Sequence, residues 1–301
     1  MEAAITVTGL TKKYGEVTAV DDLSFKVKSG EFFGILGPNG AGKTTALELI
    51  EGLREPDTGH VELLGRSPRP RNAALAMRIG VQLQASAFFE RLTAGEQLRT
   101  FADLYGVSGS RARHMLDVVG LTDKANTRIE KLSGGQAQRL SIACALVHDP
   151  ELVFLDEPTA ALDPQARRNL WDLLRQVNAD GRTVVLTTHY MDEAEFLCDR
   201  VAVMDRGRIL TVDTPTALVK NLNAPTRISV SSGFLTDDQV GEISGGTVHV
   251  DDDGIDLTFT TREPAGILTA LARHAALDGL QVRGATLEDV FLDLTGREYR
   301  S

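Results

Sequence analysis

The stretch GPNGAGKTT, from Gly37 to Thr45, is the part of the sequence that decides the fold. It follows the apolar run FFGIL, which predicts a buried strand, and it leads into GKTTALELIEGL, whose apolar spacing predicts a helix. A strand before and a helix after is the setting in which the pattern G-x-x-x-x-G-K-[ST] binds phosphates. That pattern is present at Gly37, Gly42, Lys43 and Thr44. An ordinary glycine turn is the alternative, but the pattern arises by chance in only roughly one in a hundred chains of this length.

The composition of this loop suits a polyphosphate. Small residues let several backbone N–H groups approach phosphate oxygens, and the following helix adds free N–H groups and the positive end of its dipole. Lys43 is expected to reach the β- and γ-phosphates, and Thr44 is expected to hold Mg²⁺. The residues of the stretch predicted to bind nucleotide are Gly37, Pro38, Asn39, Gly40, Ala41, Gly42, Lys43, Thr44 and Thr45.

A second run, ELVFLDEP, places two adjacent carboxylates, Asp156 and Glu157, at the end of a predicted buried strand. Ligands of parallel sheets bind outside the carboxyl ends of the strands, so this pair is expected to face the phosphates. We expect Asp156 to approach Mg²⁺ through water and Glu157 to polarise the attacking water. Alone, two acidic residues after a strand usually mark only a solvated strand end. The neighbouring phosphate loop favours the functional interpretation.

The segment KLSGGQAQRLSIACAL resembles the signature motif of ABC transporter ATPases, carried here by Leu132, Ser133, Gly134, Gly135 and Gln136. A glycine-containing helix cap is the alternative, but it explains only a Ser-Gly pair. The family's other motifs are present in the family's order, at Tyr14 in KKYGEVTAV, Gln84 in GVQLQ, Asp163 in AALD and His189 in LTTHYMDEAE. Alone, Tyr14 is more typical of a half-buried edge residue and His189 of a strand end. The resemblance covers residues 2 to about 220.

The resemblance implies the α/β fold of P-loop NTPases with an inserted helical subdomain, and it implies ATP with Mg²⁺. In a head-to-tail homodimer, each ATP lies between one subunit's glycine loop and the signature residues 133–136 of the other. Tyr14 stacks on adenine, and Asp163 belongs to the D-loop at the dimer contact. The residues implied in catalysis are Glu157, His189 and Lys43. Those implied in holding the metal are Thr44, Gln84 and Asp156.

One motif departs from the family's pattern. The two residues before Leu162-Asp163 are usually Ser, Thr or Gly, whereas here they are Ala160 and Ala161. A hydroxyl that could hydrogen-bond across the dimer is therefore missing. Since the metal, base and histidine positions are intact, we expect altered communication between the two sites and not inactivity.

Composition and charge exclude some classes of protein. The net charge of −10 argues against a general nucleic-acid binder, so no nucleic-acid partner is expected. The longest apolar runs are far shorter than the roughly 18 residues of a membrane helix, and no signal-peptide pattern begins the chain. The resemblance therefore implies a separate transmembrane permease subunit, with this chain bound at the cytoplasmic face of the membrane.

The pattern of elements predicts two domains. Apolar strands alternating with helices predict a doubly covered parallel sheet over residues 1–222, with a helical insertion at about 88–150. KNLNAPT is interpreted as a linker. Residues 223–301 predict a small α+β domain in the β-α-β-β-α-β order of ferredoxin-like folds, followed by a helix.

The last segment, GATLEDVFLDLTGREYR, resembles the end of the ATPase subunits of daunorubicin-type drug exporters, the ABC-2 class. An amphipathic helix explains the same residues: Thr286 is the predicted N-cap, and Leu287, Val290, Phe291 and Leu294 form one apolar face. The leading function is the ATPase of an exporter for drug-like compounds, lipids or glycans. Two alternatives stay open, the ATPase of an importer and a soluble ABC protein that acts outside transport.

Overall fold

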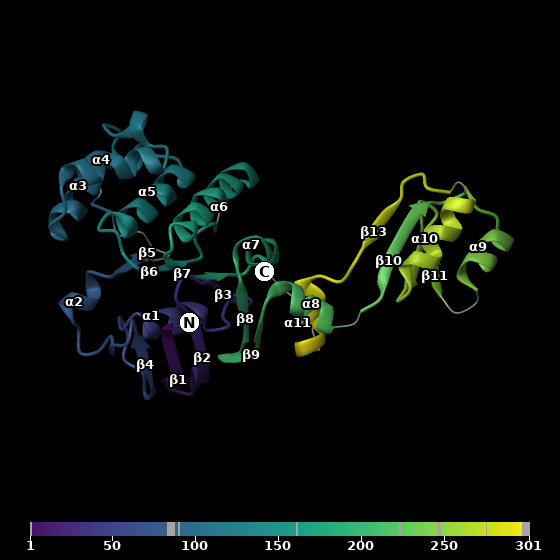
Figure 1. Ribbon diagram of the computed structural model, residues 1–301, viewed down its shortest axis with the longest axis horizontal. Helices are drawn as coiled ribbons and strands as arrows, with labels where there is room; N and C mark the ends of the chain where they lie inside the picture. Colours follow the sequence, from purple (N-terminus) through teal and green to yellow (C-terminus); the bar gives the residue numbers. More distant parts are fainter. Residues whose placement is uncertain are drawn as a thin grey trace. The chain divides into compact units, whose positions relative to one another are not determined.

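The computed structural model describes residues 2–82, 88–89, 91–160, 162–222, 224–245, 248–274 and 276–296. The chain separates into two compact units, residues 1–215 and 216–299 (Figure 1). Helix α8 (Pro215–Asn221) begins at the junction and the next strand begins at Thr226, so both ends of the linker predicted at 220–226 belong to regular elements. The domain division at 222/223 stays a prediction.

A six-stranded sheet in the order β5-β6-β7-β3-β8-β9 forms the centre of the first unit. The strands are β3 (Phe32–Leu36), β5 (Ile79–Gln82), β6 (Leu152–Asp156), β7 (Thr183–Thr188), β8 (Arg200–Asp205) and β9 (Arg208–Asp213). All neighbours run parallel except β9, which pairs antiparallel with β8. Every residue of β3, β6 and β7 is buried, so both faces of the sheet are covered, as predicted. The antiparallel edge strand was not predicted.

An antiparallel sheet of three strands lies beside the first, in the order β2-β1-β4. Its strands are β1 (Ala3–Tyr14), β2 (Val17–Lys28) and β4 (Thr58–Leu63). Helix α1 (Lys43–Ile50) packs in the same core as both sheets, through Ala46, Leu47, Leu49 and Ile50 (Figure 1). The helix that follows the glycine loop is thus held on two sides, which fixes the loop before it.

Helices α3 (Ala94–Leu104), α4 (Gly109–Val118) and α5 (Gly134–Leu146) lie between β5 and β6 and gather at one end of the unit (Figure 1). This is the predicted helical insertion, and short 3₁₀ turns at Thr122–Lys124 and Ile129–Lys131 connect α4 to α5. The predicted capping box is present, since Thr93 accepts from the Glu96 N–H and Glu96 accepts from the Thr93 N–H. The other helices of the unit are α2 (Ala73–Ala76), α6 (Pro164–Ala179) and α7 (Met191–Leu197).

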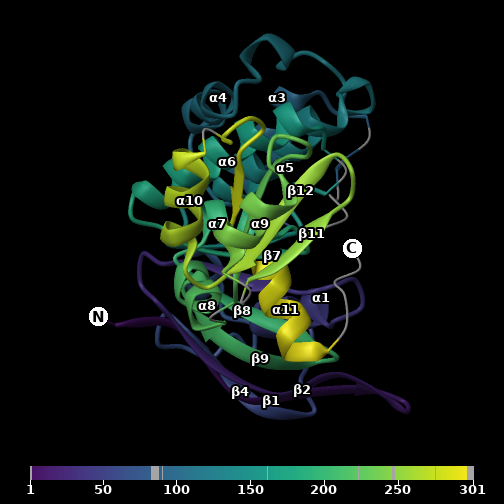
Figure 2. The same ribbon diagram turned by 90° about the vertical axis from the view of Figure 1, so that its right-hand side faces the viewer.

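The second unit contains an antiparallel sheet in the order β11-β12-β10-β13, with helices α9 and α10 packed on one face (Figure 2). The bounds are β10 (Thr226–Ser231), α9 (Asp237–Ser244), β11 (His249–Asp252), β12 (Asp256–Thr261), α10 (Pro264–Arg273) and β13 (Gln281–Arg283). Helix α9 links β10 to β11, and β12 lies between these two strands in the sheet. Helix α10 links β12 to β13, and β10 lies between them. The predicted ferredoxin-like order is therefore present as a split β-α-β arrangement.

Helix α11 (Leu287–Thr295) ends the second unit. Thr286 is its N-cap, as predicted, and the structure adds a capping box with Asp289 that was not predicted. The predicted apolar face is buried only in part. Leu287, Val290 and Phe291 are buried, whereas Leu294 is 41% exposed. The covered face is one turn shorter than predicted.

Candidate active site

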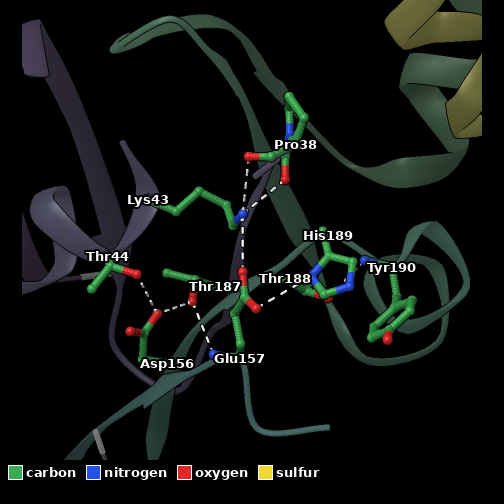
Figure 3. Close-up of polar contacts among 10 residues, drawn as sticks. Pro38, Lys43, Thr44, Asp156, Glu157, Thr187, Thr188, His189 and Tyr190 are labelled. Carbon is green, nitrogen blue, oxygen red and sulfur yellow. Dashed lines mark hydrogen bonds and ion pairs between the residues drawn. The ribbon is translucent and has the colours of Figure 1, made fainter. Parts of the chain in front are cut away.

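Three neighbouring strands bring the predicted site residues together at one edge of the six-stranded sheet (Figure 3). The glycine loop follows β3, Asp156 and Glu157 end and follow β6, and His189 follows β7. Because β6, β7 and β3 run parallel, their carboxyl ends lie side by side. Sheet order thus joins segments that are more than a hundred residues apart in the chain.

The glycine loop needs glycine for space as well as for backbone conformation. A Cβ on Gly37 would lie 2.2 Å from the carbonyl oxygen of Met204. Gly42, the N-cap of α1, has a φ of 99°, and a Cβ there would lie 2.2 Å from the carbonyl oxygen of Ala19. Any side chain at either position would therefore displace backbone and change the curve of the loop.

Lys43 is buried inside the loop that it follows. Its Nζ donates to the carbonyl oxygens of Gly37 at 2.9 Å and Pro38 at 3.2 Å. The same ammonium lies 3.1 Å from Oε1 of Glu157 (Figure 3). The cation is therefore positioned over the loop by two backbone oxygens and one carboxylate.

Glu157 occupies a strained backbone position. Its φ is 46°, in the left-handed region that residues other than glycine rarely adopt. Its N–H donates to the carbonyl oxygen of Thr187 at 3.2 Å and to the Thr187 hydroxyl at 3.0 Å, which hold it there. The second carboxylate oxygen, Oε2, lies 3.3 Å from Nδ1 of His189. Strain of this kind gathers at functional sites because surrounding contacts must maintain it.

Asp156 lies beside Glu157 but faces different groups. Its Oδ1 accepts from the Thr44 hydroxyl at 3.3 Å and from the Thr187 hydroxyl. Burial raises the pKa of this carboxyl and the nearby charge of Glu157 adds to the rise, whereas the hydroxyl hydrogen bonds lower it. The carboxylate of Asp156 and the hydroxyl of Thr44 therefore converge at the first turn of α1.

Tyr14 ends strand β1 with its ring 42% exposed. Two cations lie near the ring: the Lys12 Nζ is 5.8 Å from its centroid and the Arg54 guanidinium carbon is 5.5 Å away. A partly exposed aromatic ring flanked by cations is suited to an electron-rich base.

The signature residues lie at the start of α5 and not in the cluster around Lys43. Ser133 is the N-cap, and its hydroxyl accepts from the Gln136 N–H at 3.3 Å while Gln136 Oε1 accepts from the Ser133 N–H at 3.0 Å. A Cβ on Gly134 would meet no described atom within 4 Å, and one on Gly135 would lie 3.4 Å from the Ala166 Cβ. Nothing described within the chain thus requires glycine at position 134.

Asp163 caps α6, where its Oδ1 accepts from the Ala166 N–H at 2.9 Å. The carboxylate is therefore held over the first turn of a long helix. Gln84 and Ala161 lie outside the described residues.

The comparisons with known proteins agree with this site. Residues 20–160 match the family described as ABC transporter. The linearmycin resistance ATP-binding protein LnrL of Bacillus subtilis (strain 168) is 38% identical over 304 residues, covering 97% of this chain and 98% of that protein. The Nod factor export ATP-binding protein I of Paraburkholderia xenovorans (strain LB400) is 41% identical over 310 residues, covering 99% of this chain and 98% of that protein. The chain belongs to the ABC transporter ATP-binding proteins.

The first unit of this ABC ATPase is also similar to solved structures. A dimeric ATP-binding cassette, solved in a post-hydrolysis state with ADP and Pi, is 31% identical with a TM-score of 0.64. The match covers 70% of this chain and 98% of that one. The ABC ATPase is thus an ATPase subunit of an ABC exporter, which couples ATP hydrolysis to transport. Within the described residues, no helix is long and apolar enough to cross a membrane.

The residues of the ABC ATPase fit Mg²⁺ bound together with ATP. Mg²⁺ in phosphate sites is typically held by one or two carboxylates and by substrate phosphates. Asp156 and Thr44 supply a carboxylate and a hydroxyl at one point. Among the described residues, no group of three or more His, Cys, Asp or Glu side chains could hold a metal ion.

Sequence reasoning missed Thr187. Its hydroxyl bonds to the carboxylate of Asp156 and accepts from the Glu157 N–H, so one side chain orients both acidic residues. The only signal in the sequence is a buried polar pair, Thr187-Thr188, at the end of the apolar run TVVLTTH. A buried hydroxyl needs a partner, but the sequence does not say that the partner lies on the neighbouring strand.

Proposed function

We propose that two copies of this ABC ATPase close head to tail around two ATP molecules, each held between one glycine loop and the partner's residues 133–136. The observation that carries this proposal is the open space beside Gly134 at the N-terminus of α5. A capped helix N-terminus with free N–H groups suits the γ-phosphate, and Gly134 has no described neighbour that would explain it. The site around Lys43 is then complete only with a second subunit. The dimeric cassette at 31% identity supports the same arrangement.

In the proposed reaction, Lys43 pairs with the β- and γ-phosphates, Tyr14 stacks on adenine and Glu157 orients or deprotonates the attacking water. His189 contacts the γ-phosphate. Thr44 and Asp156, with Gln84, would hold Mg²⁺, which when bound neutralises charge on the phosphates. Asp163 lies at the dimer contact.

The ion pair between Lys43 and Glu157 links the binding of ATP to the availability of Glu157 as the general base. Lys43 is 3.1 Å from one oxygen of Glu157. Phosphate oxygens compete for the same ammonium, because charge-assisted hydrogen bonds to phosphate are strong. As the phosphates take over Lys43, the carboxylate of Glu157 becomes available to water. Binding of ATP therefore prepares the base.

The proposed transport direction is outward, and the substrate class is drug-like compounds, lipids or glycans. The printed names of two relatives, one for linearmycin resistance and one for Nod factor export, support this choice. The tail GATLEDVFLDLTGREYR supports the daunorubicin-type branch of the ABC-2 class. The chain then works at the cytoplasmic face of the membrane, bound to its permease.

The test is complementation between two inactive variants. Lys43→Ala removes the phosphate contact of one site, and Ser133→Arg blocks the signature of one subunit. Mixed dimers contain one site built from an intact glycine loop and an intact signature, so mixing is expected to restore part of the ATPase activity. Each variant alone stays inactive at every concentration. No recovery in mixtures that form dimers would contradict the proposed arrangement.

A further inference from the structure

The ring of Tyr190 lies between His189 and the first turns of helix α6. The ring centroids of His189 and Tyr190 are 4.0 Å apart, with their planes tilted by 42° (Figure 3). The guanidinium carbon of Arg167, on α6, is 4.0 Å from the centroid of the Tyr190 ring. A cation at this distance from an aromatic face is attracted to it. The imidazole therefore contacts the tyrosine, and the tyrosine contacts the arginine.

Arg167 is itself held at the start of α6. Its backbone N–H donates to the carbonyl oxygen of Asp163 at 2.9 Å, and its Nη1 lies 3.6 Å from Oδ2 of Asp192. The position of the guanidinium thus depends on the turn that Asp163 caps. The contacts continue on the other side of the histidine, where Nδ1 of His189 is 3.3 Å from Oε2 of Glu157.

A second contact between α6 and α7 lies one turn of α6 beyond Arg167. The indole N–H of Trp171 donates to Oε1 of Glu193 at 3.0 Å. Glu193 is fully buried, and burial raises the pKa of its carboxyl. This buried tie keeps α7 in place, so that changes at Arg167 or Tyr190 alter the local contact with His189 without detaching the helix.

We propose that Tyr190 and Arg167 are positioning residues that hold the imidazole of His189 against Glu157. The proposal rests on the proposed role of His189 in hydrolysis. Both side chains act through the histidine. Because Asp163 starts the helix that carries Arg167, movement of the D-loop turn is transmitted to the ring of Tyr190 and from there to the imidazole.

The chain offers a matched control on the same two helices. The guanidinium carbon of Arg175 on α6 is 4.2 Å from the centroid of the Phe196 ring on α7. This pair has the same chemistry and joins the same helices, but Phe196 follows His189 by seven residues in the chain. A loss of activity caused only by loosened packing between α6 and α7 would appear in both pairs.

The experiment compares full-length variants by ATPase kinetics, ATP affinity and thermal unfolding. Tyr190→Ala and Arg167→Gln are expected to lower kcat by about 10- to 100-fold with unchanged ATP affinity, because a misplacement of about 1 Å can cost about 100-fold. Tyr190→Phe keeps the ring and is expected to retain wild-type kcat. Arg175→Gln and Phe196→Ala are expected to lower thermal stability by as much as Arg167→Gln and Tyr190→Ala do, while leaving kcat unchanged.

Two further measurements separate this proposal from the proposed function. Arg167→Gln combined with Tyr190→Ala should lose no more activity than Tyr190→Ala alone, because both act through one contact. His189→Ala is measured beside them. Full turnover in His189→Ala would overturn the role of the histidine itself. If His189→Ala is inactive, either wild-type kcat in Tyr190→Ala or an equal loss in Phe196→Ala overturns the positioning role.

Discussion

Three acidic side chains, two at the first turn of helix α1 and one at its C-cap, differ in what balances their charge. Glu157 is paired with Lys43 at 3.1 Å, and Asp156 accepts from the hydroxyls of Thr44 and Thr187. Both carboxyl oxygens of Glu51, at the C-cap of α1, are buried and accept no hydrogen bond from the described residues. An unpaired buried carboxyl is far cheaper to keep protonated than ionised. The three residues therefore respond differently to substitution and to pH.

Glu157→Gln is expected to keep ATP binding and ATP-dependent dimerisation while turnover falls by about 10²–10⁴-fold, the usual contribution of a general base. Affinity should not fall, because the amide no longer competes with phosphate for Lys43. Nucleotide titration and light scattering with and without ATP measure the first part, and phosphate release measures the second. Wild-type turnover in this variant would show that Glu157 is not the base.

Glu51 predicts a dependence of stability on pH. Burial, then the carboxylates of Asp156 and Glu48, raise its pKa from 4.5 to about 9. Across that window the folded state keeps a proton that the unfolded chain loses, so the free energy of unfolding falls as pH rises, by up to about 1.4 kcal/mol per pH unit. This contribution is complete below the unfolded value and is lost as pH approaches the folded one.

Glu51→Gln removes this titration. Urea unfolding of the nucleotide-free protein should show the variant gaining stability over wild type as pH rises from about 5 to about 9. Glu48→Gln removes one of the charges that raise the pKa of Glu51, so in that variant the pH-dependent loss of stability should end at a lower pH than in wild type. Parallel pH curves for wild type and Glu51→Gln would count against a buried neutral Glu51.

At the scale of elements, helix termini carry much of the site. α1 begins at Gly42, α5 at Ser133 and α6 at Asp163. A helix N-terminus leaves N–H groups without intrahelical partners, and a side-chain cap satisfies only some of them. The cap of α5 therefore has two tasks in the proposed dimer: its hydroxyl stabilises the helix, and the remaining N–H groups meet phosphate.

Substitutions of Ser133 separate the two tasks. Ser133→Asp keeps a good cap, so thermal stability should stay close to wild type, but its charge repels the γ-phosphate and ATPase activity should be lost. Ser133→Ala loses the cap and should cost about 1 kcal/mol of stability. Unfolding curves and phosphate release on both variants check this. An active Ser133→Asp chain would mean that α5 does not face phosphate.

At the scale of the molecule, the chain divides its work between two units. Every described residue assigned to the ATP site lies within residues 1–215. The second unit has its own core, with Ile228, Phe259 and Leu271 fully buried. A unit with a separate core and no assigned site residue is expected to serve regulation, dimer stability or coupling to the permease.

Deleting residues 223–301 is expected to leave Mg²⁺-dependent ATP binding intact while dimer stability, coupling or export falls. Circular dichroism first establishes that the truncated chain is folded, and nucleotide titration then compares its affinity with that of the full chain. A second truncation after Pro215 tests whether α8 matters, since the second unit begins there. A folded truncation that no longer binds ATP would mean that the second unit completes the site.

Much of the fold and the site could be predicted from the sequence, because many of its determinants are local. The capping box at Thr93 and the N-cap at Thr286 depend on residues close in the chain, and the phosphate-binding pattern lies within nine residues. The β-α-β-β-α-β order of the second unit follows from alternating patterns along the chain. Strand β9 and helix α8 were missed, because RILTVD and PTALVKN are short and have only weak periodicity.

Only the tertiary structure decided which of these local features meet. Thr187 orients Asp156 and Glu157 because β6 and β7 are neighbours in the sheet, and Tyr190 meets Arg167 because α7 packs on α6. The left-handed backbone of Glu157 is maintained by bonds to the next strand. Strand order and helix packing are set by how the whole core excludes water, a property of the assembled chain. A local pattern can mark a residue as buried or polar, but it carries no record of the distant residue that will contact it.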